Sequence, residues 1–186
     1  MIQKFRLTFL LLALNAIAFI TLFILSSGQY KIYQESQGLN YSITSFTESL
    51  ESIHIESLQL QESINISKRN NRWFIDSPVQ WPANNFSVNQ IVHQLNLLKE
   101  SATFTYNELI ETDQNLKDFG LDAPKLTFNL KKGSQSLSLL VGNSTPLGNK
   151  LYIYLPEKKS IYVVESDLLK DDVLKVKDLY SKQIFD

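Results

Sequence analysis

The sequence contains no cysteine among its 186 residues. It therefore has no disulfide, no thiolate nucleophile and no thiolate ligand for a metal ion. It also lacks the cysteine to which a lipid would be attached after an N-terminal signal. A domain without such cross-links must be held together by its hydrophobic core alone.

An excess of charge of either sign is also missing. The chain has 18 Lys and Arg against 19 Asp and Glu, which gives a formal net charge of −1 at pH 7. A face that binds nucleic acid needs a basic surplus, and so does an electrostatic grip on anionic lipid. The charge balance therefore argues against nucleic acid as a partner and against a polybasic attachment to a membrane.

One long hydrophobic run stands at the start of the chain. Leu7–Leu25 contains no charged residue, and as a helix it would be about 28 Å long, close to the hydrocarbon thickness of a bilayer. We expect a transmembrane helix that lies in membrane lipid. A cleavable signal peptide is the alternative, although its apolar part usually covers only about 7–15 residues. Because Lys4 and Arg6 precede the run, the N-terminus should stay in the cytoplasm and the rest should lie outside.

The sequence predicts three segments. Residues 1–28 form the cytoplasmic tip and the anchor, residues 29–49 form a polar stalk, and residues 50–186 form one extracytoplasmic domain. The last segment has the length of an ordinary single domain.

Strands are predicted where apolar and polar residues alternate. This pattern occurs around 53–55, 64–66, 126–130 and 137–141. Turn signals beside 73–75, 151–155 and 161–164 predict further strands there, and 103–106 is another candidate. The end of the chain, 176–186, is expected to pair or pack with the domain.

Three helices are expected between these strands. The first begins at Ser87, a predicted N-cap with Gln90 completing a capping box and Phe86 packing against Ile91, and it runs to about Lys99. A short helix over 113–119 ends at Gly120, and a last one follows Ser166 through 174. The predicted fold is α+β, with a mostly antiparallel sheet and amphipathic helices packed on it.

Several segments, taken in order, resemble one family. They include Trp73 with Pro78, the turn Gly120-Leu121-Asp122-x-Pro124, and Val141-Gly142 followed by Thr145 and Gly148. In this order they are similar to the domain of unknown function 4340 family (DUF4340), over about Leu50 to Asp186. The resemblance implies a bacterial envelope protein with one N-terminal span. Some members are similar to partners of transport systems associated with gliding motility. It implies no catalytic residue.

No motif names a chemistry, so we predict no catalytic, cofactor-binding or metal-binding residue. The stretch 142–150 resembles a phosphate-binding loop, but its spacing is wrong and a strand pattern follows it, which argues against nucleotide. His54 and His93 lack a second ligand at helical spacing. Asp167, Asp171 and Asp172 lack the glycine and the alternation of a calcium loop.

The tyrosines Tyr152, Tyr154 and Tyr162 are predicted to share one face of the sheet. They either pack across strands or form an aromatic platform for a sugar or a protein. We expect a non-catalytic interaction or accessory module of a transport or surface-assembly system, with other envelope proteins and transporter components as partners. A carbohydrate- or peptidoglycan-binding module is the alternative, followed by a hydrolase without a recognisable signature.

Overall fold

A computed structural model describes residue 22 and residues 38–58, 61–148, 150–165 and 176–182. The chain divides into two units, Met1–Gly38 and Leu39–Asp186. The predicted span over 7–25 and the predicted helix over 166–174 lie outside the described residues, apart from Leu22. Among the described residues, no helix is both long enough and apolar enough to cross a membrane.

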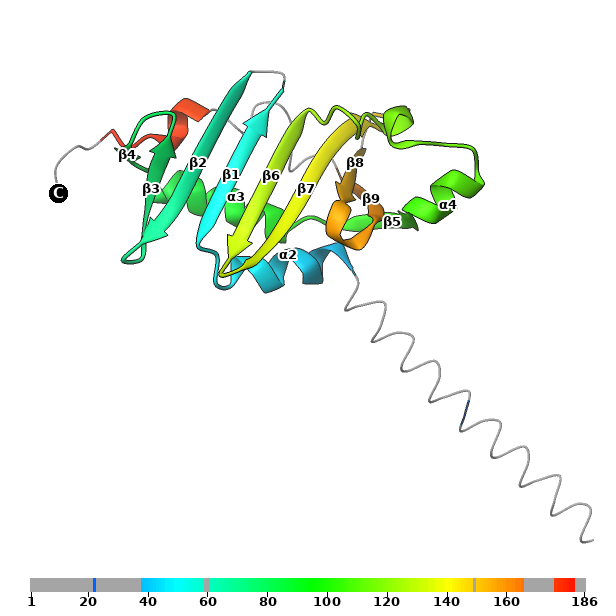
Figure 1. Cartoon of the computed structure of the whole chain (residues 1–186), viewed down its shortest axis with the longest axis horizontal. Coiled ribbons are helices and arrows are strands. Elements are labelled where there is room, and N and C mark those ends of the chain that lie inside the picture. The colour runs from blue at the N-terminus through cyan, green and yellow to red at the C-terminus, as the bar shows by residue number, and fades with distance from the viewer. Residues whose placement is uncertain (1–21, 23–37, 59–60, 149, 166–175, 183–186) are drawn as a thin grey trace, which may run out of the picture. The chain divides into compact units, whose positions relative to one another are not determined.

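The second unit is built on a nine-stranded antiparallel sheet, so the predicted α+β fold with an antiparallel sheet is confirmed (Figure 1). The strands lie in the order β4-β3-β2-β1-β6-β7-β8-β9-β5. Their bounds are β1 Ser52–Ser57, β2 Glu62–Arg69, β3 Arg72–Ser77, β4 Trp81–Pro82, β5 Glu100–Thr105, β6 Leu126–Lys132, β7 Gln135–Ser144, β8 Lys150–Leu155 and β9 Ser160–Glu165.

Two meanders meet in the middle of this sheet. The first runs outward from β1 to β4 and the second from β6 to β9, and β1 pairs with β6 along its whole length. Between the two meanders the chain crosses from one end of the sheet to the other. The strand β5 follows the first meander in the sequence but pairs with β9, the last strand of the second.

The main core lies on one face of the sheet. In Figure 1, α3 (Asn85–Asn96) lies behind the strands, and α2 (Leu39–Thr47) lies at their lower ends. They contribute Leu39, Ile43, Val88, Ile91 and Leu95 to a cluster with the inward side chains of the strands, among them Ile53, Ile66, Phe128, Leu139 and Ile153. The strands β1–β3 and β6–β9 supply alternate residues to this cluster, which is the period-two pattern of a half-buried strand.

A smaller cluster lies on the opposite face, at the β8–β9–β5 end. It contains Leu109 of α4 (Tyr106–Glu111), Phe119 of the short 3₁₀ helix η1 (Leu116–Phe119), Leu121 and Ile161. The helix α4 begins with a capping box, because the Thr105 hydroxyl accepts from Glu108 N–H while the Glu108 carboxylate accepts from Thr105 N–H.

The end of η1 agrees with the sequence prediction. Gly120 has φ 67°, a left-handed conformation that costs a glycine little, and Leu121 N–H donates to Leu116 C=O at 2.9 Å. Gly142 of β7 lies directly beside this turn. A Cβ at Gly142 would stand 2.3 Å from the Phe119 carbonyl oxygen, so the strand can approach the turn only because this residue has no side chain.

The stalk predicted over 29–49 is wrong in its second half. Residues 39–47 form α2, and the Leu39 and Ile43 side chains are completely buried in the main core. The Glu100 carboxylate accepts from Leu39 N–H at 2.9 Å, which ties the start of α2 to β5. The apolar residues of this short helix are few, and polar residues surround them in the sequence. The polar composition of the segment therefore indicated a stalk.

The predicted start of α3 is also wrong. Asn84 is the N-cap, and its side chain accepts from the N–H groups of Phe86 and Ser87. Phe86 is 75% exposed and therefore does not pack against Ile91. The error arose because Asn84 and Ser87 are both good N-cap residues. Val88, Ile91 and Leu95 of α3 are buried against the sheet.

The predicted packing of the C-terminal region is confirmed where it is described. Leu179, in the 3₁₀ helix η4 (Val176–Leu179), is 2% exposed within the main core. Tyr180 forms an antiparallel bridge with Ala83, and the Trp81 indole N–H donates to Ser181 C=O at 3.0 Å. These contacts hold the end of the chain against β4 and the start of α3.

Candidate functional site

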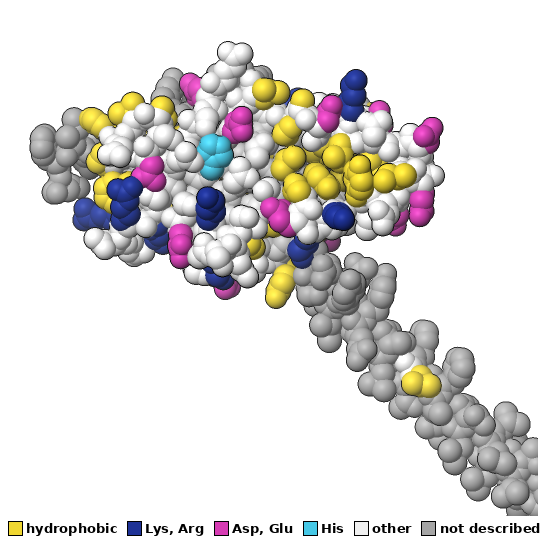
Figure 2. All heavy atoms as spheres, viewed as in Figure 1, with side chains coloured by type: hydrophobic (Ala, Val, Ile, Leu, Met, Phe, Trp, Pro, Cys, Tyr) yellow, Lys and Arg dark blue, Asp and Glu magenta, His cyan; other side chains and the backbone are white. Residues whose placement is uncertain are grey.

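The candidate site is the face of the sheet opposite α2 and α3, which we call the open face. Its side chains come from the strand residues that alternate with the buried ones. Two parts of it differ in chemistry. Over the strands in the middle of the sheet this face carries few hydrophobic side chains, whereas a group of them gathers toward the β8–β9–β5 end, as Figure 2 shows.

A row of neutral polar side chains crosses five neighbouring strands of the open face. The register pairs Ser77 with Asn65, Asn65 with His54, His54 with Asn129 and Asn129 with Ser138. We call these five residues the polar row. All of them are exposed or half-buried.

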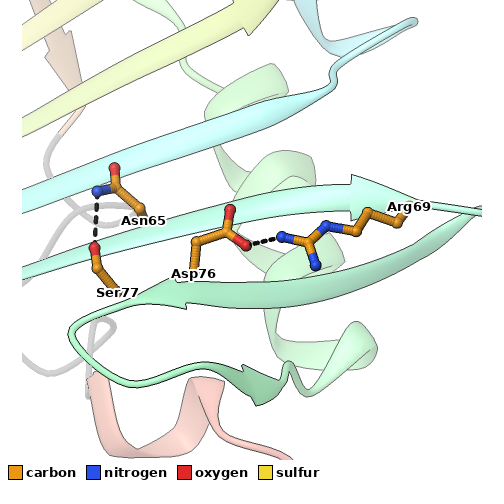
Figure 3. A network of polar contacts seen from close by, with 4 residues as sticks. All are labelled: Asn65, Arg69, Asp76 and Ser77. Carbon is orange, nitrogen blue, oxygen red and sulfur yellow. Dashed lines mark hydrogen bonds and ion pairs between the residues drawn. The ribbon is translucent and has the colours of Figure 1, made fainter.

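Hydrogen bonds order one end of the polar row. The Asn65 side-chain N–H donates to Ser77 Oγ at 2.8 Å, as Figure 3 shows. The Asn65 carbonyl oxygen lies 2.6 Å from His54 Nδ1. Because this oxygen only accepts, His54 donates through Nδ1, and a neutral His54 then presents an acceptor at Nε2.

Charged groups flank the polar row without entering it. Glu56 lies two residues along β1 from His54, and Lys131 lies two residues along β6 from Asn129. Arg69 forms an ion pair with Asp76 beside the row in Figure 3, and its guanidinium lies over the Phe74 ring at 5.6 Å. This ion pair is exposed, so it contributes little to stability.

The hydrophobic part of the open face consists of half-buried side chains that pack against the smaller cluster. We call them the apolar patch: Phe104, Leu116, Leu140, Tyr152 and Tyr154. The rings of Tyr152 and Phe119 meet edge to face with centroids 4.8 Å apart, and Phe104 lies 5.5 Å from Phe119. Burial, followed by the nearby Tyr106 and Glu157, raises the pKa of Tyr154 above 10.0, so its hydroxyl is a neutral hydrogen-bonding group at pH 7.

The predicted face of three tyrosines is wrong in one member. Tyr162 pairs with Ile153 and is 1% exposed in the main core, whereas Tyr152 and Tyr154 lie on the open face. Burial raises the pKa of Tyr162 above 10.0 as well. The side of each tyrosine depends on how β8 and β9 pair, which the sequence of either strand alone does not reveal.

The other sequence candidates that the structure describes do not form a common site with His54. His93 is exposed on α3, on the other side of the sheet from His54. The stretch 142–150 joins β7 to β8 through a turn in which Gly148 N–H donates to Thr145 C=O, so no helix follows it. Asp167, Asp171 and Asp172 lie outside the described residues. Among the described residues, no group of three or more His, Asp or Glu side chains is arranged to hold a metal ion.

Sequence reasoning did not identify the polar row or Leu140 as candidates. Alternation does place Asn65, Asn129 and Ser138 on polar faces of their strands, so part of the signal was present. Their alignment into one row required the pairing of β1 with β6, two strands that are distant in the sequence.

The comparisons with known proteins give one match. The sequence model of the family described as "Domain of unknown function (DUF4340)" matches residues 73–186. The match begins at Trp73 and is thus shorter than the resemblance expected from Leu50. Searches of curated proteins and of solved structures found no match to this chain. Because the matched region covers more than half of the sequence, the chain belongs to the DUF4340 family.

Proposed function

We propose that this chain is a single-pass protein of the bacterial cytoplasmic membrane. Leu7–Leu25 is its retained anchor, its N-terminus lies in the cytoplasm, and the folded domain lies in the periplasm or extracytoplasmic space. The support is the length and apolar composition of this run and the position of Lys4 and Arg6 before it.

We further propose that the domain is a non-catalytic accessory module that binds another envelope protein, in a transport or surface-assembly system. The observation that carries this proposal is the apolar patch. Large hydrophobic side chains that gather on one face of a folded domain are typical of protein-binding surfaces. Tyrosine and phenylalanine are enriched in the buried parts of such interfaces.

The patch is suited to docking because its side chains already pack on a buried cluster. Phe104, Tyr152 and Leu140 rest on Phe119 and Ile161, which are buried beneath them. A partner would therefore bury more hydrophobic surface without first ordering these side chains, and the entropic cost of binding would be small. Covering one half-buried leucine such as Leu140 contributes at most about 1.5–3 kcal/mol.

Site-specific cross-linking tests the partner proposal in intact cells. A photoreactive amino acid at Leu140 should give one discrete cross-linked protein, and the same substitution at Leu147 should not. Leu147 is the matched control, because it is 90% exposed and lies outside the patch. Leu140→Glu should abolish co-purification of that same protein, whereas Leu147→Glu should not. Equal cross-linking from both positions, or none from Leu140, would refute binding at the patch.

Membrane attachment is tested separately. The full-length, unprocessed protein should remain with the membrane pellet after washing with alkaline carbonate, and removal of residues 1–28 should release it. Release of the intact chain by carbonate would overturn the anchor without affecting the proposal for the patch.

A further inference from the structure

We propose that the polar row binds a neutral glycan chain, of the extended β-1,4-linked kind, which lies across the strands. This site is distinct from the apolar patch and does not depend on the proposed protein partner. Ser77, Asn65, His54, Asn129 and Ser138 form it together.

The charge of the row selects the class of ligand. Its members are two serines, two asparagines and one histidine, with no lysine, arginine or carboxylate among them. A surface that binds nucleic acid or anionic lipid needs a cluster of cations. A protein interface has an apolar centre, which the row lacks. A polyhydroxylated neutral ligand matches donors and acceptors that carry no charge.

The spacing of the row fits a repeating ligand. Neighbouring strands lie about 4.8 Å apart, so five side chains on consecutive strands offer hydrogen-bonding groups along roughly 19 Å. The sugar residues of an extended β-1,4-linked chain repeat over a similar length. Each residue of the glycan could therefore meet the side chain of the next strand.

The row is also ordered before any ligand arrives. The chain of hydrogen bonds from His54 through Asn65 to Ser77 holds three of its five side chains in place. The Glu157 carboxylate accepts from Ser138 N–H at 3.0 Å, which fixes the backbone at the other end. Binding would then cost little side-chain entropy at these positions.

The side chains of the row determine which hydrogen bonds a sugar hydroxyl would make with them. With Nδ1 engaged by Asn65, a neutral His54 accepts from a sugar hydroxyl at Nε2. Asn129 lies between His54 and Ser138 in the row, and its side chain offers both a donor and an acceptor. Loss of the Asn129 side chain should therefore interrupt the row of hydrogen bonds to the glycan between His54 and Ser138.

Titration of the full-length protein in mild detergent with chitopentaose, a neutral β-1,4-linked pentamer of N-acetylglucosamine, tests this proposal. We expect saturable binding by calorimetry, and Asn129→Ala should weaken it about 3- to 10-fold, which corresponds to the loss of one hydrogen bond. The triple variant His54→Ala/Asn129→Ala/Ser138→Ala should show no binding. Gln90→Ala, which removes an exposed amide from α3, is the matched control and should bind like the wild type.

Two further measurements show whether a loss of glycan binding arises from unfolding of the variant or from the apolar patch. Circular dichroism should show that each variant is folded, and Leu140→Glu should retain its affinity for chitopentaose. Sedimentation with purified peptidoglycan sacculi, competed by chitopentaose, would identify the cell wall as the source of the glycan. Binding of the pentamer without sedimentation would instead indicate a soluble or surface polysaccharide. Absence of pentamer binding at millimolar concentration, or equal binding by the folded triple variant, would overturn the proposal.

Discussion

Replacement of Ile43 by alanine tests whether α2 belongs to the folded domain. The Ile43 side chain is completely buried in the main core. Its truncation removes buried hydrophobic surface and leaves a cavity, which costs about 2–5 kcal/mol of unfolding free energy. A domain of this size has only about 5–15 kcal/mol of stability in total, so the loss is a large fraction of it.

Urea unfolding of the full chain gives the measurement, followed by tryptophan fluorescence. Trp73 is a suitable reporter because it is 3% exposed in the same core. For a loss of about 3 kcal/mol and an m-value near 2 kcal/mol/M, the midpoint should fall by about 1.5 M. Tyr41→Ala is the matched control on the same helix, since Tyr41 is 57% exposed and its loss should change stability by less than about 0.5 kcal/mol.

Comparison of the two variants distinguishes a helix packed in the core from a solvated stalk. If residues 39–47 were a solvated stalk, neither substitution would change the midpoint. Ile43→Ala and Tyr41→Ala with midpoints that agree within error would therefore refute the placement of α2 in the core.

Three further predictions concern local structure. Asn84→Ala should lower the unfolding free energy by about 1 kcal/mol through loss of the N-cap, and Ser87→Ala should change it much less; the reverse order would restore Ser87 as the cap. Gly142→Ala should cost at least about 1–3 kcal/mol in urea unfolding, because the new Cβ meets the Phe119 carbonyl oxygen; an unchanged midpoint would contradict this contact. The pKa of Glu108 is lowered from 4.5 by hydrogen bonds from Thr105, the backbone N–H first. The cap of α4 should therefore be fully formed above pH 4.5 and weaken as the pH falls through the lower, folded-state pKa, and a carboxyl titration by NMR that placed this pKa above 4.5 would refute it.

The strands were predictable because their signal is local. Residues such as Ile53, Ile64 and Phe128 alternate with polar neighbours, and a strand that is buried on one face requires this period. Gly120 was identified as a helix end for a similar reason, since a left-handed residue after a helix favours glycine.

Helix boundaries were less predictable, because several residues competed for the same role. Asn84 and Ser87 are both favourable caps, and the structure shows that the helix begins after Asn84, with Val88 and Leu95 buried against the sheet. In α2, polar residues dominate the composition, and only contacts with the distant sheet reveal that Leu39 and Ile43 are buried.

The sequence by itself determined which side chains alternate along each strand and where the turns between neighbouring strands lie. Only the tertiary structure decided that β1 pairs with β6 and β5 with β9, since those partners are separated by long stretches of chain. The pairing of β8 with β9 sets Tyr162 opposite Ile153 in the core and Tyr154 opposite Ile161. The pairing of β1 with β6 aligns His54 with Asn129. The physical reason is that alternation within one strand decides which of its residues share a face, whereas the register between strands decides which face is buried and which residues are neighbours across the sheet.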